Sequence, residues 1–195
     1  LARTTALLYF INNIEDEVAY ERARKSLLPN AAIFVVLFVA YVVFLMVTKG
    51  YDVDPSTGAV SLVQYKYLHN FLAMPVILIV FLVGVVLVLA GVILTLVKKG
   101  FRKGIWLEGV GVVLAVLGLL LILGYNNTAY YPSIADINSS LTIQNSSSSP
   151  YTLKAMSIVS LLIPFVLAYI FYAWRAIDRK KITRHEMGQD EEIKY

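Results

Sequence analysis

The sequence has no cysteine, only two histidines, and 15% charged residues among its 195 positions. Without cysteine there can be no disulfide, thiolate metal site, iron–sulfur cluster or thiol nucleophile. Two histidines leave little from which this chain alone could ligate haem or zinc. Soluble domains carry roughly a quarter charged residues, whereas 58% of this chain is hydrophobic and its mean hydropathy is +0.71. The composition therefore disfavours an ordinary soluble domain.

Four long apolar runs predict four membrane-spanning helices, because roughly 20 apolar residues cross the hydrocarbon core of a bilayer. None of the runs alternates polar and apolar residues, so the pattern does not favour a β-barrel. We predict an all-α, polytopic transmembrane helical bundle, with spans at about residues 31–47, 71–97, 105–125 and 155–174.

The distribution of lysine and arginine predicts the orientation of these spans. Fourteen of the 17 basic residues lie in residues 1–30, 98–103 and 175–195, and the other three are Lys49, Lys66 and Lys154. Because cytoplasmic segments carry the excess of basic residues, we expect both ends of the chain in the cytoplasm. We expect the basic charge to contact membrane lipids, and no nucleic acid.

The two terminal segments are predicted to be cytoplasmic extensions of this bundle. Residues 1–30 resemble the end of a preceding helix that runs into an amphipathic segment, which Pro29 and Asn30 interrupt before the first span. Residues 175–195 form a charged tail, expected to be solvated and disordered around residues 190–192.

Small residues recur at helical spacing within the spans. Gly111, Ala115 and Gly118 share one face of the third span, Gly84 and Gly91 lie seven residues apart in the second, and Ser157, Ser160 and Ala168 share a face of the fourth. Such faces permit close approach of helices. Pro164 removes one backbone hydrogen bond and is expected to kink the fourth span.

Two charged residues within apolar segments leave alternatives open, because charge in a membrane is costly. Glu108 is either an interfacial carboxylate paired with Arg102 and Lys103, the interpretation we favour, or a proton-uptake group. Arg3 would lie deep in the membrane if residues 1–13 are helical, and would then need a partner.

The other residues that could bind a metal ion or haem are interpreted as structural residues. His69 stands at the outer end of the second span, but His185 is on the tail, so a bis-histidine haem site is disfavoured. Met74 and Met156 are expected to fill packing gaps. The Asp52-Val53-Asp54 sequence resembles the start of a calcium loop but lacks the later ligands, so a turn over residues 52–58 is expected. We assign no catalytic, cofactor-binding or metal-binding residue to this chain.

A set of short motifs occurs in the order found in one known family, cytochrome bd-type quinol oxidase subunit II. The outer loop before the last span carries most of this resemblance, and the last span and the first 25 residues add to it. The motifs are Tyr131-Pro132-Ser133, Ser140–Asn145, Ser147–Ser149, Tyr151-Thr152-Leu153 with Met156, Pro164–Tyr169, Ala6–Tyr9, Glu17, Glu21–Arg24, Asn70 and Pro75.

The resemblance implies that the chain is the C-terminal half of that subunit, helices five to eight, and that the N-terminal half of the same subunit is missing. A start at Leu1 rather than methionine agrees with this. In the family, the complex oxidises quinol and reduces oxygen to water in the bacterial cytoplasmic membrane. Haems b and d belong to subunit I, the expected partner, and this chain would bind no haem. A bound quinone or lipid remains open.

Two further hypotheses compete with the oxidase subunit. Four spans could be half of a membrane transporter, or a structural tetraspan scaffold. For the oxidase hypothesis we expect the outer loop over residues 131–156 to be ordered and to cap the helices.

Overall fold

The structure is a computed structural model in which residues 1–177 are described. The predictions made for residues 178–195, including the tail and His185, lie outside the described residues. The elements, in chain order, are α1 (Ala2–Asn13), α2 (Glu17–Val47), β1 (Gly50–Val53), β2 (Val60–Val63), α3 (Lys66–Ala73), α4 (Pro75–Val97), α5 (Gly104–Gly124), the 3-10 turn η1 (Ile137–Ser139), α6 (Ile143–Ser146), α7 (Pro150–Ser160) and α8 (Ile163–Ile177).

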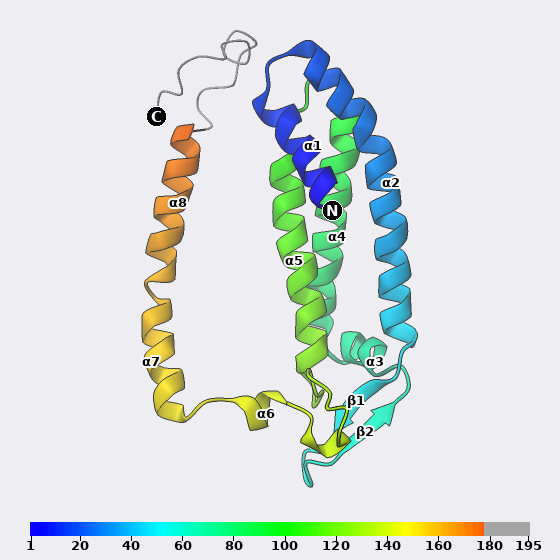
Figure 1. Cartoon of the computed structure of the whole chain (residues 1–195), viewed down its shortest axis with the longest axis vertical. Helices are drawn as coiled ribbons and strands as arrows, with labels where there is room; N and C mark the ends of the chain where they lie inside the picture. Colours follow the sequence, from blue (N-terminus) through cyan, green and yellow to red (C-terminus); the bar gives the residue numbers. More distant parts are fainter. Residues whose placement is uncertain (178–195) are drawn as a thin grey trace.

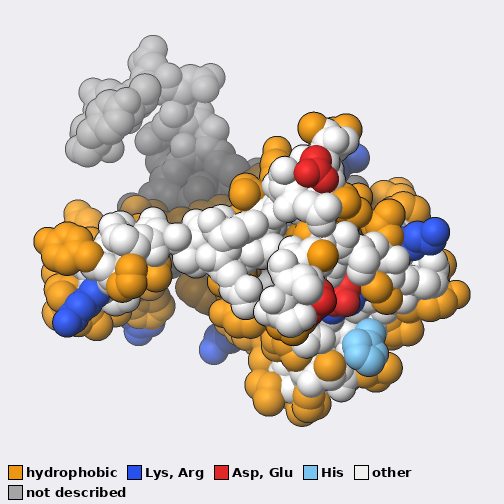
Figure 2. All heavy atoms as spheres, turned by 90° about the horizontal axis from the view of Figure 1, so that it is seen from below, with side chains coloured by type: hydrophobic (Ala, Val, Ile, Leu, Met, Phe, Trp, Pro, Cys, Tyr) orange, Lys and Arg blue, Asp and Glu red, His pale blue; other side chains and the backbone are white. Residues whose placement is uncertain are grey.

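Four helical segments are long and apolar enough to cross a membrane: α2, α4, α5 and the α7–α8 pair. This confirms the predicted polytopic helical bundle. Helices α2, α4 and α5 run alongside one another, and α7–α8 stands apart from them (Figure 1). Seen from the end that carries the hairpin, acidic side chains and a histidine lie among uncharged polar side chains and backbone, and hydrophobic side chains predominate around the rim (Figure 2).

Helix α2 corrects the prediction that Pro29 and Asn30 interrupt the chain before the first span. The helix is continuous from Glu17 to Val47 with Pro29 inside it. Buried Leu27 and Ala31 pack on either side of the proline in a cluster that includes Leu8 of α1. This packing holds the helix together, although the proline removes one backbone hydrogen bond.

Helices α4 and α5 form the closest contact in the bundle, through the predicted small residues. A Cβ atom on Gly111 would lie 2.6 Å from the carbonyl oxygen of Gly84, and one on Gly91 would lie 2.7 Å from that of Gly104. A Cβ on Gly118 would lie 2.8 Å from the Cβ of Phe81. The backbones of the two helices therefore touch, which only glycine allows at these positions.

The fourth span is broken, and it is exposed along its length. Helix α7 ends at Ser160 and α8 begins at Ile163, one residue before Pro164, so the expected kink is present as a break. The small-residue face of Ser157, Ser160 and Ala168 is exposed and meets no helix within residues 1–177. The packing that we predicted for this face is therefore not made by the described part of this chain.

A hairpin that was not predicted from the sequence covers one end of α4 and α5, the end that the predicted orientation places outside and that is called the outer end below. Strands β1 and β2 pair antiparallel, Tyr51 with Leu62. The chain after α5 joins them: the Val53 amide donates to the Asn127 carbonyl at 2.8 Å, and the Val60 amide donates to Oδ1 of Asn138 at 3.0 Å. The bulk of the fold remains helical.

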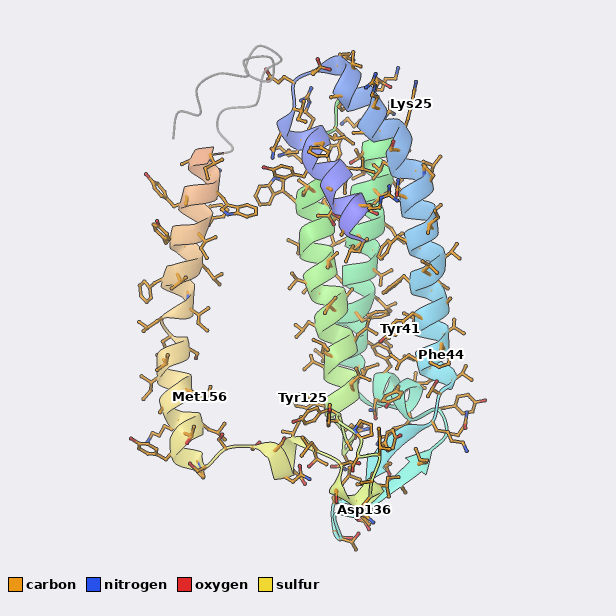
Figure 3. The ribbon with its side chains drawn as sticks, in the orientation of Figure 1. Lys25, Tyr41, Phe44, Tyr125, Asp136 and Met156 are labelled. Atoms are coloured by element: carbon orange, nitrogen blue, oxygen red, sulfur yellow. The ribbon has the colours of Figure 1, made fainter. Side chains whose placement is uncertain are left out.

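The outer loop is only partly as predicted. Buried Thr128 pairs with Asp52 of β1, and Asn138 accepts from the Val60 amide of β2, so this part of the chain lies against the hairpin and caps the helices. The remainder leads away to α7, where Met156 is exposed and lies apart from the α4–α5 pair (Figure 3). The cap therefore ends within α6, where the Tyr130 hydroxyl donates to the Ser146 hydroxyl at 2.8 Å, and the prediction that it extends to Met156 is wrong.

The contact between α4 and α5 predicts opposite effects for two glycines of one helix. Gly111→Ala forces a methyl group against the Gly84 carbonyl, and we expect it to destabilise the protein by about 1–3 kcal/mol. Gly109→Ala meets nothing within 4 Å, so we expect no loss and a small gain in helix propensity. Thermal unfolding of the detergent-solubilised protein measures both variants, and equal stability of the two would contradict the packing.

Candidate functional site

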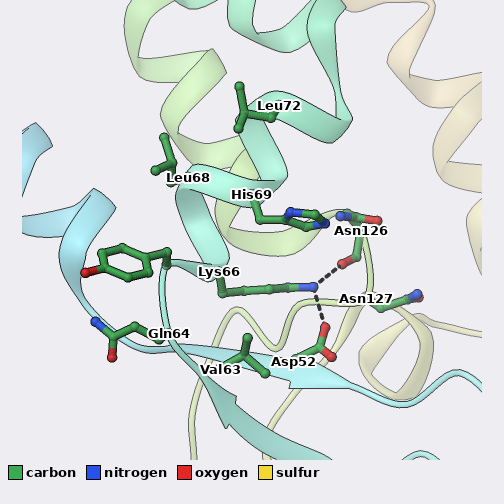
Figure 4. Close-up of a pocket in the computed structure, with 10 residues that line it drawn as sticks. Asp52, Val63, Gln64, Lys66, Leu68, His69, Leu72, Asn126 and Asn127 are labelled. Carbon is green, nitrogen blue, oxygen red and sulfur yellow. Dashed lines mark hydrogen bonds and ion pairs between the residues drawn. The ribbon is translucent and has the colours of Figure 1, made fainter.

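A buried lysine organises the outer end of the bundle. Lys66 is the first residue of α3, and it follows Tyr65, whose φ of 58° lies in the left-handed region. The Lys66 side chain is 6% exposed; it forms an ion pair with Asp52 of β1 and donates to the Asn126 carbonyl at 2.9 Å (Figure 4). One cation thus joins α3, the hairpin and the chain after α5.

Asn70, one turn further along α3, completes the connection. It is fully buried, and its amide donates to the Ile122 carbonyl at 2.8 Å and to the Thr128 hydroxyl at 2.9 Å. The side-chain oxygen of Asn70, Oδ1, accepts a hydrogen bond from the Asn126 side chain at 2.9 Å. A buried amide with three partners fixes geometry, so Asn70 sets how α3 sits on the end of α5.

Residues 126 and 127 reverse the chain after α5. Asn126 and Asn127 have φ values of 58° and 52°, which asparagine tolerates better than most residues. The paired asparagines are the signal in the sequence that could have predicted this turn. From the sequence alone, Asn70 is only part of a family resemblance, and Lys66 bears only on the orientation of the spans.

Lys66 and its neighbours border an open pocket of about 590 Å³ at this end of the bundle. His69 faces Asn126 across one side of the pocket, and Leu68 and Leu72 supply an apolar wall (Figure 4). Within the described part of the chain, this is where polar side chains of the helices and the hairpin meet.

These residues do not fit a haem. An axial ligand needs a large apolar pocket around it, whereas His69 stands on an open pocket beside the Lys66–Asp52 ion pair. Met74 packs into the apolar cluster around Phe71 and Phe81, and Met156 lies exposed on α7.

The two aspartates of the hairpin do not converge on a cation either. Asp52 pairs with Lys66, whereas Asp54 accepts hydrogen bonds from the Ser56 amide and hydroxyl and from the Thr57 hydroxyl, at 2.7–2.9 Å. These bonds, those from Ser56 foremost, lower the pKa of Asp54 to about 2. Asp54 therefore anchors a turn, as the sequence predicted.

Glu108 on α5 contradicts the interpretation that we favoured for it. The residue is fully buried, and neither carboxylate oxygen has a hydrogen-bond partner within residues 1–177. Arg102 instead donates to the Ile14 carbonyl at 2.8 Å and lies 5.4 Å from the centre of the Tyr20 ring, and Lys103 is exposed. The predicted ion pair is absent because Arg102 closes the corner between α1 and α2.

Arg3 lies on a helix, as α1 begins at Ala2. Its side chain is exposed, and it makes no ion pair with the residues that the structure describes. Arg3 is therefore helical, as considered above, but no residue within 1–177 forms the ion pair that a buried Arg3 would need.

The comparisons with known proteins identify the family. The model of the cytochrome bd terminal oxidase subunit II family matches residues 1–177. The chain belongs to this family. No curated protein matches the chain. As a member of the family, this multi-pass membrane protein is a component of a terminal oxidase, an oxidoreductase complex with more than one subunit.

The buried lysine yields a prediction for the outer end of this oxidase subunit. Lys66→Met leaves Asp52 and the Asn126 carbonyl without their donor, and we expect a loss of stability on the order of 1–3 kcal/mol. Lys49→Met, the same change at an exposed position, should be neutral. Thermal unfolding of the purified complex compares the two variants. A neutral Lys66→Met would show that the contacts of Lys66 with Asp52 and the Asn126 carbonyl do not stabilise the cap.

Asp54 yields a prediction that depends on pH. Because the folded pKa of about 2 lies below the ordinary value of 3.8, the ionised carboxyl stabilises the turn above pH 4, and this contribution is lost as the pH falls toward 2. Asp54→Ala should therefore speed hydrogen exchange at residues 54–60 at pH 7. The difference from wild type should shrink as the pH falls from about 4 to about 2, as measured by mass spectrometry, and equal exchange at pH 7 would refute the anchor.

Proposed function

We propose that this chain is a non-haem-binding part of subunit II in a cytochrome bd-type oxidase that oxidises quinol and reduces oxygen to water. The observation that carries the proposal is the family match over residues 1–177. The order of the short motifs along the chain, from Ala6 to Tyr169, supports the same assignment. The membrane is proposed to be the cytoplasmic membrane of a bacterium, with the basic end of the bundle inside.

In this proposal the chain supports catalysis that takes place in a partner, subunit I, which carries haems b and d. The unsuitable surroundings of His69 support this division of labour. The packed α4–α5 pair and the cap built on Lys66 give the chain a rigid frame. We further propose that the chain corresponds to the C-terminal half of subunit II, and that the N-terminal half of the subunit and membrane lipids cover its exposed apolar helices.

A visible spectrum of the native complex tests the proposal. The full-length parent protein is isolated from its membrane in mild detergent, and a reduced-minus-oxidised spectrum is recorded. We expect b-type and d-type haem bands to co-purify with it, together with quinol-dependent oxygen consumption. An intact complex without haem bands would overturn the proposal, and would favour a transporter half or a structural scaffold.

A further inference from the structure

Glu108 is the one acidic side chain in the membrane-spanning parts of α4 and α5, and the function proposed above does not use it. It lies four residues after the start of α5, about 6 Å along the helix axis. The residue is fully buried, and neither carboxylate oxygen has a hydrogen-bond partner within the part of the chain that the structure describes. An ionised, unpaired carboxylate in such a place is strongly disfavoured, so the group must carry a proton, contact water, or do both.

The neighbouring turn of α1 supplies hydroxyl groups at the level of Glu108. A Cβ on Gly104 would lie 3.2 Å from the Leu8 side chain, so these two turns touch, and α1 and α5 run in opposite directions (Figure 1). One turn further toward the centre of the bundle, Thr4 and Thr5 therefore lie beside Glu108. The Thr5 hydroxyl donates to the Leu1 carbonyl at 3.3 Å, and the Thr4 hydroxyl is buried without a partner within residues 1–177.

No cation in the described chain neutralises this carboxyl by an ion pair. Helix α4 has no charged residue, and Glu108 is the only one on α5. From α2, Arg24 donates to the carbonyls of Thr95 and Leu96 instead. On α1, Arg3 is exposed and makes no ion pair with the residues that the structure describes.

Glu108 lies near one end of the bundle. The start of α5 lies one helical turn away, at the end that carries Lys25 and is proposed to face the cytoplasm (Figure 3). Thr5 also borders an open groove of about 920 Å³ between α1, α5 and Trp174 of α8, but apolar residues line nearly all of this groove, so it suits lipid or another helix and not water. Beyond Glu108, residues 109–124 of α5 have no polar side chain, so α5 itself offers no further step toward the outer end.

We propose that Glu108, with the hydroxyls of Thr4 and Thr5, is a proton-exchanging site on the cytoplasmic side of subunit II. A hydronium ion gives one proton to a carboxylate oxygen and leaves water and a neutral carboxyl. The reverse step returns the proton to water. The inference rests on the proposed function, since reduction of oxygen to water consumes protons that this site would help to supply.

Infrared spectroscopy of the intact complex tests the site directly. In the wild type, the carbonyl stretch of a protonated carboxyl should shift on transfer into D₂O, because its proton exchanges with water. Glu108→Gln should remove this band, Glu108→Asp should keep it, and the matched control Glu17→Gln, an exposed acid at the start of α2, should leave it unchanged. A band that survives Glu108→Gln, or that does not shift in D₂O, overturns the proposal.

Proton uptake tests whether the exchange serves the oxidase. With a pH-sensitive dye and a pulse of oxygen, Glu108→Gln should slow uptake several-fold at unchanged haem content, and Glu108→Asp should restore most of it. Unchanged uptake in Glu108→Gln overturns the inference, while haem bands in the wild type leave the proposed function intact. Missing haem bands in the wild type reject the function itself.

A second variant serves if Glu108→Gln fails to assemble. Thr5→Val should then shift the frequency of the carboxyl band, and an unshifted band overturns the proposal.

Discussion

The contact between the backbones of α4 and α5 is the constraint on which the rest of the structure depends. In a membrane, lipid tails are as apolar as leucine, so helices gain little from hiding apolar surface and associate through close van der Waals contact. Gly84, Gly91 and Gly111 allow that contact along most of the pair. Helices α1 and α2 and the outer cap are then placed against a rigid two-helix centre.

At both ends of this two-helix centre, polar side chains bind backbone carbonyl groups that the helices leave free. At the outer end the last carbonyl groups of α5 and the reversing chain are satisfied by Asn70 and Lys66, which are both buried. At the other end Arg24 and Arg102 donate to backbone carbonyls of α4 and of the α1–α2 corner. Polar side chains thus close the helix ends, while Glu108 stays out of both networks.

The spans and the α4–α5 contact could be predicted because both follow from local rules, the length of apolar runs and the spacing of small residues. The hairpin and the role of Lys66 could not be predicted, since Asp52, Lys66 and Asn126 are far apart in the sequence and become partners only when the start of α3 lies beside the end of α5. Glu108 was predicted to pair with Arg102 and Lys103 because they are close in the sequence. In the structure Arg102 instead contacts the Ile14 carbonyl and the Tyr20 ring. Pro29 misled the prediction because its breaking effect is local, whereas the packing of Leu27 and Ala31 is not.

The position of Arg24 has a consequence for the electrostatics of the bundle. The last carbonyl groups of α4 form the negative end of its helix dipole, and the guanidinium of Arg24 donates to two of them, those of Thr95 and Leu96. A planar fork can bind two adjacent oxygens at once, which the single ammonium of a lysine matches less well. Helix α2 therefore supplies the counter-charge for α4, and separating the two helices would expose an uncompensated dipole as well as apolar surface.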